Sequence, residues 1–334
     1  MPTTIDDASV SMTTRVAIET RPLGRSAVQM PRIALGCGNF GGVGSAPEFF
    51  GKGLDELQAF AILDAAWELG ITHLDTADAY GGGRSETTIG NWMRSRGVRP
   101  LLTTKTFNPM QAGADHGLAP ERMTRQLHSS LERLGVGRVD LYLAHDFDPD
   151  ADPARVVATL EGFRAQGLIR ATGVSNYDAA ALRETLACGH VDAIQNNHSL
   201  LQRADEAELA GLCVAEGVSY TVYSPLAGGW LTGKYRRGHE FPPGSRMTQR
   251  PGPYAGFLDD RVFDSLERLA EIATRRGMSM AGLSLAWLLA DPAVAAVVIG
   301  PGSPAQLQPV REALEQPLDE RAREQIGALF AWAR

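Results

Sequence analysis

The stretch "THLDTADAYGGGRSE", residues 72–86, joins an apolar strand to a polar loop. The strand ends at Asp75, and Tyr80 follows five residues later, in front of three consecutive glycines. A short apolar run with a polar residue at its carboxyl end is the unit that recurs along this chain. The fold class therefore depends on how many such units there are and on what separates them.

Eight short apolar runs predict buried strands, and amphipathic helical patterns lie between them. The first helical pattern begins at Asp55 and stops at Gly70. Strands that alternate with helices pair in parallel through right-handed crossovers. The count and the chain length predict a (β/α)8 TIM barrel, although alternation alone also fits a doubly wound sheet. The predicted strands span residues 32–35, 72–75, 101–105, 140–145, 170–173, 193–196, 219–223 and 295–299.

Composition and charge narrow the function classes. The chain has 334 residues and a net charge of −7, which argues against a nucleic-acid partner. Three widely spaced cysteines without a CxxC motif indicate a reducing compartment, and no disulfide scaffold or metal site. The first residues are acidic, and no apolar run reaches the roughly 18 residues of a membrane span. We expect a cytoplasmic protein with a flexible tail over residues 1–18 and one barrel domain over 19–334.

Two segments are too long to be simple connections. They span residues 36–53 and 225–253, and both follow predicted strands, so in a barrel they lie on the carboxyl-terminal face. We expect residues 36–53 and 229–253 to line a pocket there. The expected aromatic walls of that pocket are Phe49, Phe50, Trp230 and Tyr254.

Four polar residues at predicted strand ends would meet at one mouth of the barrel: Asp75, Tyr80, Lys105 and His145. Each has an ordinary structural explanation by itself, such as a turn cap or a surface charge. Together they predict a proton-delivery site. A lysine beside Tyr80 favours its phenolate and is expected to lower the tyrosine pKa, while Asp75 holds the lysine.

The segment "GCGNFG", residues 36–41, matches a dinucleotide-binding fingerprint. That motif requires a helix to begin at once, and the chain instead continues "GVGSAPEFFGKG". Asp55 lies at nearly the spacing of a ribose-binding acid but is expected to cap a helix. We therefore disfavour a Rossmann domain. Motifs for acyl or phosphoryl transfer are missing from the sequence.

Asp75, Tyr80, Lys105 and His145, in this order, resemble the catalytic tetrad of the aldo-keto reductases. The blocks "GLIRATGVSNY", "AIQNNHSLLQR", "YSPLAGGWLTGKY" and "VIGPGS" are similar to later blocks of that family, and the resemblance runs from about Arg21 to the end. It looks most like the branch with potassium-channel β subunits and their bacterial relatives. It implies a barrel with an N-terminal β-hairpin cap and long loops on the carboxyl-terminal face, without a metal. The implied chemistry is hydride transfer between a nicotinamide and a carbonyl or alcohol, with Tyr80 as general acid and His145 positioning the carbonyl oxygen.

The resemblance also implies cofactor contacts, position by position. Ser175, Asn176 and Gln195 match residues that bind the nicotinamide carboxamide. Tyr223 matches the residue that stacks on the ring. The remaining matches along the pyrophosphate and adenosine are Ser224, Leu226, Gly228, Lys234, Arg246, Gly300, Gly302 and Gln306, and Gly36 and Cys37 are further expected cofactor contacts.

The adenosine end departs from the family pattern. Gly302 stands where relatives have a polar or basic residue, and Pro309 and Val310 stand where a Glu-Asn pair is usual. A 2′-phosphate thus lacks its expected arginine, although Ser303 could supply one hydrogen bond. NADP(H) is the favoured cofactor on the resemblance, and NAD(H) remains possible.

Two other functions remain open from the sequence. One is a nicotinamide-sensing regulatory subunit with little turnover, and the other is a barrel enzyme without a nicotinamide, such as a sugar isomerase. The expected partner is a small-molecule carbonyl or alcohol, and the sequence leaves a homo-oligomer open.

Overall fold

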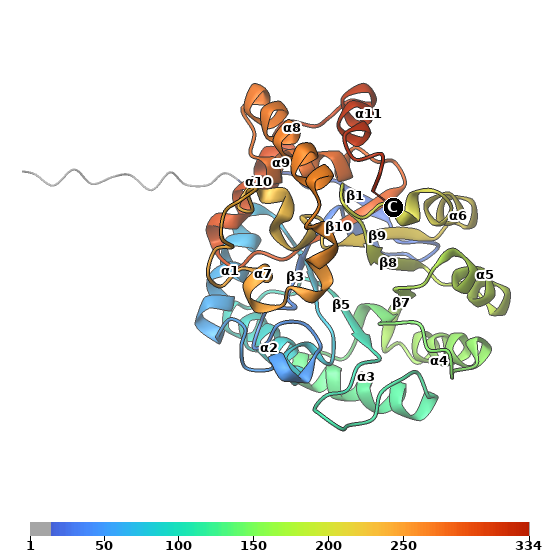
Figure 1. Cartoon of the computed structure of the whole chain (residues 1–334). Coiled ribbons are helices and arrows are strands. Elements are labelled where there is room, and N and C mark those ends of the chain that lie inside the picture. Colours follow the sequence, from blue (N-terminus) through green and yellow to red (C-terminus); the bar gives the residue numbers. More distant parts are fainter. Residues whose placement is uncertain (1–14, 334) are drawn as a thin grey trace, which may run out of the picture.

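The structure, a computed structural model, describes residues 15–333, and these form a closed barrel of eight parallel strands surrounded by helices (Figure 1). Residues 1–14 of the predicted tail and Arg334 lie outside the described residues. The strand order around the barrel is β10-β3-β4-β5-β6-β7-β8-β9. The predicted (β/α)8 barrel is confirmed, and closure excludes a doubly wound sheet. The strands are β1 Thr20–Pro22, β2 Gln29–Pro31, β3 Ile33–Gly36, β4 His73–Asp75, β5 Leu101–Thr106, β6 Val139–Ala144, β7 Ile169–Ser175, β8 Ala193–Asn197, β9 Ser219–Tyr223 and β10 Val294–Ile299.

The helices form the outer ring, and none of those in the described part of the chain is long and apolar enough to cross a membrane. The α-helices are α1 Glu56–Leu69, α2 Arg84–Arg96, α3 Pro120–Leu134, α4 Pro153–Ala165, α5 Ala179–Cys188, α6 Leu209–Glu216, α7 Arg246–Gln249, α8 Asp260–Arg276, α9 Met280–Leu289, α10 Gln308–Glu315 and α11 Glu320–Ala328. Short 3-10 helices occupy the loops: η1 Pro47–Phe49, η2 Tyr80–Gly83, η3 Ala204–Glu206, η4 Ala227–Thr232, η5 Gly252–Phe257 and η6 Pro304–Leu307.

An antiparallel hairpin, β1 and β2, precedes the barrel, as the resemblance implied. Its buried side chains, Leu23, Val28 and Met30, join the small cluster that fills the barrel interior. Because this cluster lies apart from the larger core between strands and helices, the hairpin closes the amino-terminal end of the barrel. The opposite end is left for polar groups.

Alternation along each strand decides which residues point into the barrel. In β5, Leu101 packs against the inner cluster, so Lys105 points inward as well. In β4, His73 and Asp75 share one face, and His73 Nε2 lies 2.8 Å from Thr103 Oγ1 inside the barrel. The sequence pattern thereby brings Asp75 and Lys105 to the carboxyl end of the interior.

The chain enters α1 as the sequence predicted. Asp55 accepts from the backbone N–H of Gln58, and the Gln58 side chain returns a bond to Asp55, which forms a capping box. Gly70 ends the helix with a φ of 109°. Near this end of α1, the backbone N–H of Val16 donates to the Leu69 carbonyl oxygen at 3.0 Å, so the described start of the chain lies against the helix.

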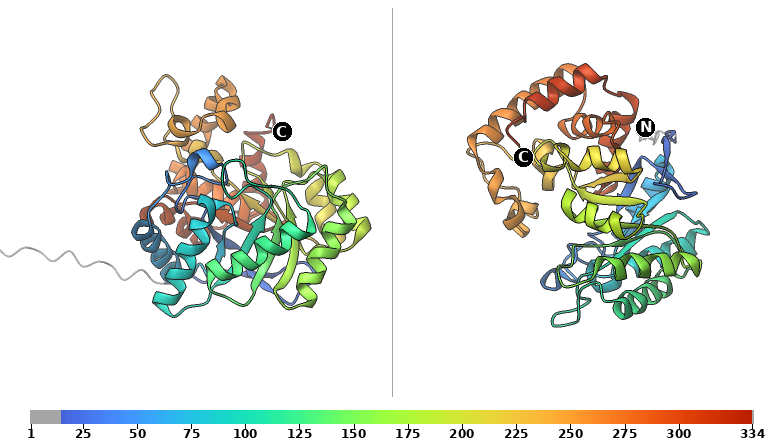
Figure 2. Two further views of the ribbon diagram at one scale, coloured as in Figure 1. Left: turned by 90° about the horizontal axis from the view of Figure 1, so that it is seen from below. Right: turned by 90° about the vertical axis from the view of Figure 1, so that its right-hand side faces the viewer.

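The two long segments gather at the carboxyl-terminal end of the barrel. In the left-hand view of Figure 2, the orange segment with α7 and η5 rises from one end of the barrel near the blue loop after β3. Phe49 of η1 and Arg250, directly after α7, are in contact, so the two segments meet. Together they form adjoining parts of the rim of one pocket mouth.

Gly173 gives a test of how tightly the barrel interior is packed. A Cβ there would lie 2.4 Å from Leu143 Cδ2 and 2.6 Å from the Ala193 carbonyl oxygen. We expect Gly173→Ala to destabilise the fold by about 1–3 kcal/mol through overpacking. Gly162 is the opposite case, because a Cβ added there, in the interior of α4, would meet no atom within 4 Å. Gly162→Ala should therefore stabilise the fold by roughly 0.5–1 kcal/mol. Urea unfolding of both variants measures the two shifts, and equal signs would contradict this account.

Candidate active site

A buried ion pair lies at the centre of the mouth. Lys105 Nζ donates to Asp75 Oδ1 at 2.5 Å, and the two side chains are 1% and 3% exposed. Lys105 also donates to the Thr76 carbonyl oxygen at 2.9 Å, and Gln195 Nε2 donates to Asp75 Oδ2 at 2.8 Å. Burial alone would lower the pKa of Lys105, but Asp75 and Tyr80 together raise it. The lysine is therefore held as a cation.

Tyr80 reaches the ion pair from η2. Gly81 and Gly82, with φ of 60° and 67°, take left-handed turns that let the chain fold back after the tyrosine. Lys105 Nζ lies 5.2 Å from the centre of the Tyr80 ring. The tyrosine hydroxyl is 3.5 Å from His145 Nε2, and the two rings pack edge to face. The structure thus brings together the four residues predicted at strand ends.

The pKa of Tyr80 differs from the sequence-based expectation. Burial raises it above its ordinary value, Lys105 lowers it, and Asp75 raises it again. The net shift is upward, so the prediction of a lowered pKa was wrong for the ligand-free protein, because it took account of the lysine but not of burial. Tyr80 retains its proton at neutral pH, as a general acid must.

His145 is held uncharged. Burial and the nearby Lys105 both lower its pKa well below the ordinary value. Its carbonyl oxygen accepts from Asn176 Nδ2 at 2.8 Å, and its Nδ1 lies 3.4 Å from Asn108 Nδ2. An amide that donates to Nδ1 leaves the ring proton on Nε2, which faces Tyr80. His145 can therefore donate a hydrogen bond toward the same point as Tyr80.

A pocket of about 560 Å³ opens above these residues. Asn176 and Ser224 adopt left-handed conformations, with φ of 62° and 57°, which are uncommon for residues other than glycine and concentrate at functional sites. The predicted site residues in its lining are Tyr80, His145, Ser175, Asn176, Gln195, Tyr223 and Ser224. The lining also contains polar residues that sequence analysis did not single out, namely Asn108, Asn197, Gln202 and Arg250, of which Arg250 falls within the expected lining range 229–253.

Two of the missed residues present unsatisfied oxygens. Asn197 Oδ1 and Gln202 Oε1 are buried and have no hydrogen-bond partner among the described residues. Such atoms are costly unless a ligand supplies the donor. On the same side, Tyr223 donates to Asn176 Oδ1 at 2.6 Å. An aromatic ring beside free amide acceptors fits a nicotinamide carboxamide.

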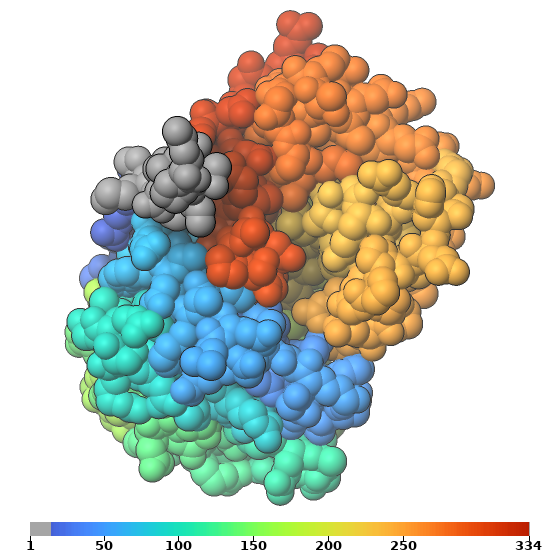
Figure 3. All heavy atoms as spheres, turned by 90° about the vertical axis from the view of Figure 1, so that its left-hand side faces the viewer, coloured from blue at the N-terminus to red at the C-terminus, as the bar shows by residue number. Residues whose placement is uncertain are grey.

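The segment after β9 fits an anion. Gly228 and Gly229 have positive φ, and a Cβ on Gly229 would lie 2.4 Å from Lys234 Nζ. No carboxylate of the described residues pairs with Lys234, which lies over the Tyr235 ring. An ammonium group above a glycine turn matches what a pyrophosphate requires. Figure 3 shows a recess between the gold atoms of this segment and the orange-red atoms after β10.

The other predicted cofactor residues lie outside the pocket lining. Leu226 and Gly228 belong to the turn around η4, and Arg246 begins α7. At the adenosine end, the backbone N–H of Gly302 donates to Gln306 Oε1 at 2.8 Å, with Gly300 just before.

Beneath the mouth, Gly36 ends β3 and Cys37 is fully buried. The Cys37 thiol donates to the Leu35 carbonyl oxygen, and burial raises its pKa well above the ordinary value. Its side chain therefore does not face the pocket.

Trp230 is not a pocket wall, contrary to the sequence-based expectation. It is fully buried and packs against Tyr235, Phe241, Phe257 and Phe263. The residue instead fastens the segment after β9 onto the start of α8. Of the other expected aromatic residues, Tyr254 lines the pocket. Phe49 packs against Arg250 and Phe50 lies against Gly82, and neither is part of the lining.

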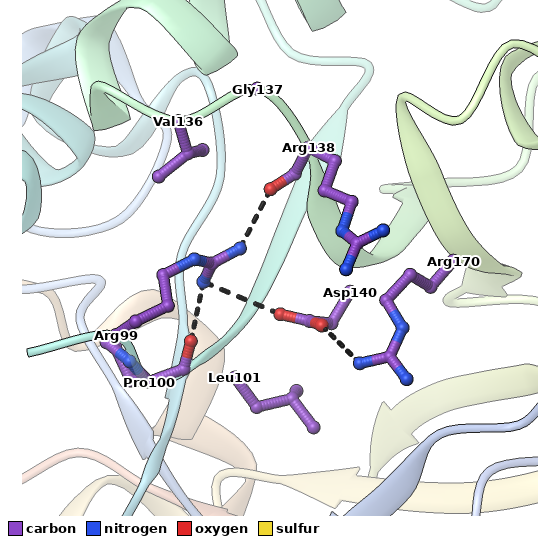
Figure 4. A pocket seen from close by; sticks show the side chains of 8 residues that line it. All are labelled: Arg99, Pro100, Leu101, Val136, Gly137, Arg138, Asp140 and Arg170. Atoms are coloured by element: carbon purple, nitrogen blue, oxygen red, sulfur yellow. Dashed lines mark hydrogen bonds and ion pairs between the residues drawn. The ribbon is translucent and has the colours of Figure 1, made fainter.

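A second hollow, of about 630 Å³, lies at the amino-terminal end of β5, β6 and β7. Figure 4 shows Asp140 between Arg99 and Arg170. Arg170 Nη1 donates to Asp140 at 2.9 Å, and Arg99 also donates to the carbonyl oxygens of Pro100 and Arg138. These exposed arginines are largely satisfied within the protein, so we assign them a structural role. Among the described residues, no group of three or more His, Cys, Asp and Glu side chains could hold a metal.

A barrel whose carboxyl-terminal mouth carries Asp, Tyr, Lys and His around a polar pocket has the architecture of a (β/α)8 enzyme. A model of the aldo/keto reductase family matches residues 32–330, and the chain belongs to that family of oxidoreductases.

Individual relatives agree with this assignment. The NADH-specific methylglyoxal reductase of Escherichia coli (strain K12) is 32% identical over 303 residues, which cover 86% of this chain and 90% of that protein. A putative voltage-gated potassium channel subunit beta of Schizosaccharomyces pombe is 32% identical, with 86% and 85% covered. The holo form of aldo-keto reductase AKR11C1 from Bacillus halodurans superposes with a TM-score of 0.76 at 26% identity, covering 94% of this chain and 96% of that one.

Asp78 supports the loop that carries Tyr80. It accepts from Thr106 Oγ1 and from the backbone N–H of Ala79, both at 2.6 Å, and Arg122 donates to Thr106 at 2.8 Å. Burial raises the pKa of Asp78 to about 7. The folded protein therefore keeps a proton on Asp78 that the unfolded chain releases near pH 4.

This proton predicts a pH dependence of stability. Between about pH 4 and 7 the native state binds the extra proton, so Asp78 makes stability fall as pH rises, by about 1.4 kcal/mol per unit. We expect Asp78→Asn to remove this slope in urea titrations over that range. Asp64→Asn serves as the control, since Arg96 lowers the pKa of Asp64 and that residue acts only at lower pH. An unchanged slope in Asp78→Asn would contradict the assignment.

Proposed function

We propose that this protein reduces an aldehyde or ketone with NAD(P)H, or runs the reverse oxidation, with Tyr80 as general acid. The observation that carries the proposal is the convergence of Tyr80, His145 and the Lys105–Asp75 pair below a pocket with free amide acceptors. A bound reduced nicotinamide would supply the hydride. The substrate is a small carbonyl or alcohol, and membership of an oxidoreductase family supports this class.

The protein's own groups handle the proton. As the carbonyl oxygen gains negative charge, it takes the proton that burial keeps on Tyr80, and the resulting phenolate lies beside the Lys105 cation. His145 Nε2–H orients the oxygen toward the tyrosine hydroxyl. Asp75 fixes the lysine through the 2.5 Å bond, so no large rearrangement is required during proton transfer.

The proposed cofactor-binding roles come from the family resemblance and are supported by the pocket lining. Ser175, Asn176 and Gln195, with Asn197 and Gln202 beside them, would hold the carboxamide, and Tyr223 would stack on the ring. Ser224, Leu226, Gly228, Lys234 and Arg246 would hold the pyrophosphate. Gly300, Gly302 and Gln306 would lie toward the adenosine, whereas Gly36 pairs with Asp75 in the barrel and would meet the cofactor near the catalytic residues.

Removal of the Tyr80 hydroxyl tests the mechanism. We expect Tyr80→Phe to lower kcat by about 10²–10⁴-fold, because the proton donor is lost, while cofactor affinity changes little. Tyr177 offers a matched control, since it lies outside the pocket lining and Tyr177→Phe makes the same chemical change. Loss of reduced-nicotinamide absorbance with an aromatic aldehyde measures turnover. Turnover in Tyr80→Phe equal to that of the unsubstituted protein would refute the assignment.

A regulatory, cofactor-sensing role is the second candidate, because one relative carries the name of a potassium-channel β subunit. The complete Asp, Tyr, Lys and His grouping favours the enzyme, since a sensor needs the cofactor pocket but not a proton donor. Tight cofactor binding without turnover on any carbonyl would favour the sensor.

The cofactor preference is expected to be weak. Resemblance to the family favours NADPH, but Gly302 offers no cation to a 2′-phosphate, and one relative is named as NADH-specific. We propose that both cofactors serve, with NADPH somewhat preferred. All three cysteines are free, two of them buried, which supports a reducing compartment such as the cytoplasm.

Restoring the missing cation tests this view of the adenosine end. A Cβ at Gly302 would meet only Gln306, at 3.6 Å or more, so the position itself accepts a side chain. We expect Gly302→Arg to raise kcat/KM for NADPH relative to NADH by roughly 10-fold, the effect of one charge-assisted hydrogen bond. Steady-state kinetics with both cofactors measures the ratio. If kcat/KM for NADPH relative to NADH does not change in Gly302→Arg, the 2′-phosphate does not bind next to residue 302.

A further inference from the structure

We propose that Arg250 makes the pocket selective for carbonyl substrates that carry an anionic group, a carboxylate or a phosphate. This inference rests on the proposed function and names its substrate class. Arg250 follows α7 and is part of the pocket lining. Among the described lining residues, it is the one side chain of the Lys, Arg, Asp and Glu types.

The pocket is otherwise neutral. His145 is uncharged because burial and Lys105 lower its pKa, and the Lys105–Asp75 pair lies beneath the lining with its charges cancelled. A single positive charge therefore remains in the pocket lining of a protein whose net charge is −7. Such a charge attracts an anionic substrate and disfavours a cationic one.

Arg250 has no acidic partner within the described part of the chain. No Asp or Glu oxygen there pairs with its guanidinium, although the side chain is half-buried. By contrast Arg237, on the outer surface, pairs with three acidic residues of α8. Arg250 instead lies over the Phe49 ring, 5.4 Å from its centre. A guanidinium that rests its face on an aromatic ring keeps its N–H donors free at the edge, where a carboxylate or phosphate binds in a bidentate manner.

The position of Arg250 relative to Tyr80 suits a short substrate. A Cβ on Gly44 would lie 3.5 Å from Arg250 Nη1, so the guanidinium borders that residue. The Gly44 carbonyl oxygen accepts from the backbone N–H of Gly81, the neighbour of Tyr80. Gly44 thus borders Arg250 on one side and the loop of Tyr80 on the other, and all three residues line the same pocket. An aldehyde with a terminal anion can therefore meet Tyr80 and Arg250 within one pocket.

The competing explanation is that Arg250 only fastens two loops together through Phe49. Lys52 separates the two explanations, because its ammonium also lies 5.4 Å from the centre of the Phe49 ring but is not part of the pocket lining. Lys52→Gln removes a cation from the same ring without changing the pocket. Arg250→Gln removes both the ring contact and the charge in the pocket.

The experiment compares matched aldehydes with and without an anion: succinic semialdehyde with butanal, and glyceraldehyde 3-phosphate with glyceraldehyde. The unsubstituted enzyme should prefer the anionic member. In Arg250→Gln we expect kcat/KM for the anionic member to fall about 10- to 100-fold more than for its neutral counterpart, the effect of losing one or two charged hydrogen bonds. Arg250→Lys should recover part of the loss, and Lys52→Gln should leave all four values unchanged. The two pairs show whether carboxylate or phosphate is preferred.

Two results would overturn the inference. One is an equal fall for anionic and neutral aldehydes in Arg250→Gln, which indicates loop fastening. The other is weaker cofactor binding in that variant, measured by quenching of tryptophan fluorescence, which would make Arg250 a cofactor residue.

Failure of the proposed function is distinguishable, because the unsubstituted protein would then reduce no aldehyde of either kind. In that case, calorimetry with succinate and with phosphoglycolate on the cofactor-loaded protein still tests Arg250. Binding that is lost in Arg250→Gln but kept in Lys52→Gln supports the anion site, and binding that is equal in all three proteins refutes it.

Discussion

The buried ion pair of Lys105 and Asp75 is the interaction on which the rest of the site depends. Removing either partner would leave an unpaired charge in the barrel, which typically costs 3–5 kcal/mol. The pair exists because β4 and β5 are paired neighbours in the barrel, and because alternation points both residues inward. Thr76 and Gln195 satisfy the remaining donors and acceptors of the pair, so both charges are held in one geometry. Fold and chemistry are thus specified by the same alternation.

The pair also decides the protonation states around it. Asp75 cancels much of the field of Lys105, so burial determines the pKa of Tyr80 and keeps its proton in place. His145 experiences burial and the lysine in the same direction and stays neutral. A neutral donor next to a neutral histidine suits reduction, in which the proton must be available before charge develops on the substrate. In the proposed mechanism the lysine acts later, when Tyr80 becomes a phenolate, because its ammonium group lies 5.2 Å from the centre of the Tyr80 ring.

The strand pattern favoured the barrel, because buried parallel strands are apolar on both faces and their ends carry the polar residues, but it left a doubly wound sheet open until closure of the barrel was seen. Asp75, Lys105 and His145 were therefore accessible from the sequence. The burial of the Tyr80 side chain cannot be predicted from the residues around it in sequence. For that reason the direction of its pKa shift was predicted wrongly. Trp230 was misplaced because a glycine-rich segment looks like an open loop, whereas the tertiary structure packs it as an aromatic cluster. Arg250 was missed because its importance comes from partners that are lacking, which only a folded structure reveals.

The two ends of the barrel show where the structure retains polar groups without satisfying them. At the amino-terminal end, Asp140 accepts from a backbone N–H and from Arg170, and the arginines find internal acceptors. At the carboxyl-terminal end, Asn197 and Gln202 keep free oxygens and Arg250 keeps a free cation. Buried side-chain atoms without a partner also occur away from the mouth, such as Arg32 Nε and His190 Nε2, so a lack of partners alone does not mark a binding site. Asn197 and Gln202 differ from them because both line the pocket, where a ligand can complete their bonds and offset a cost of about 1–3 kcal/mol for each group.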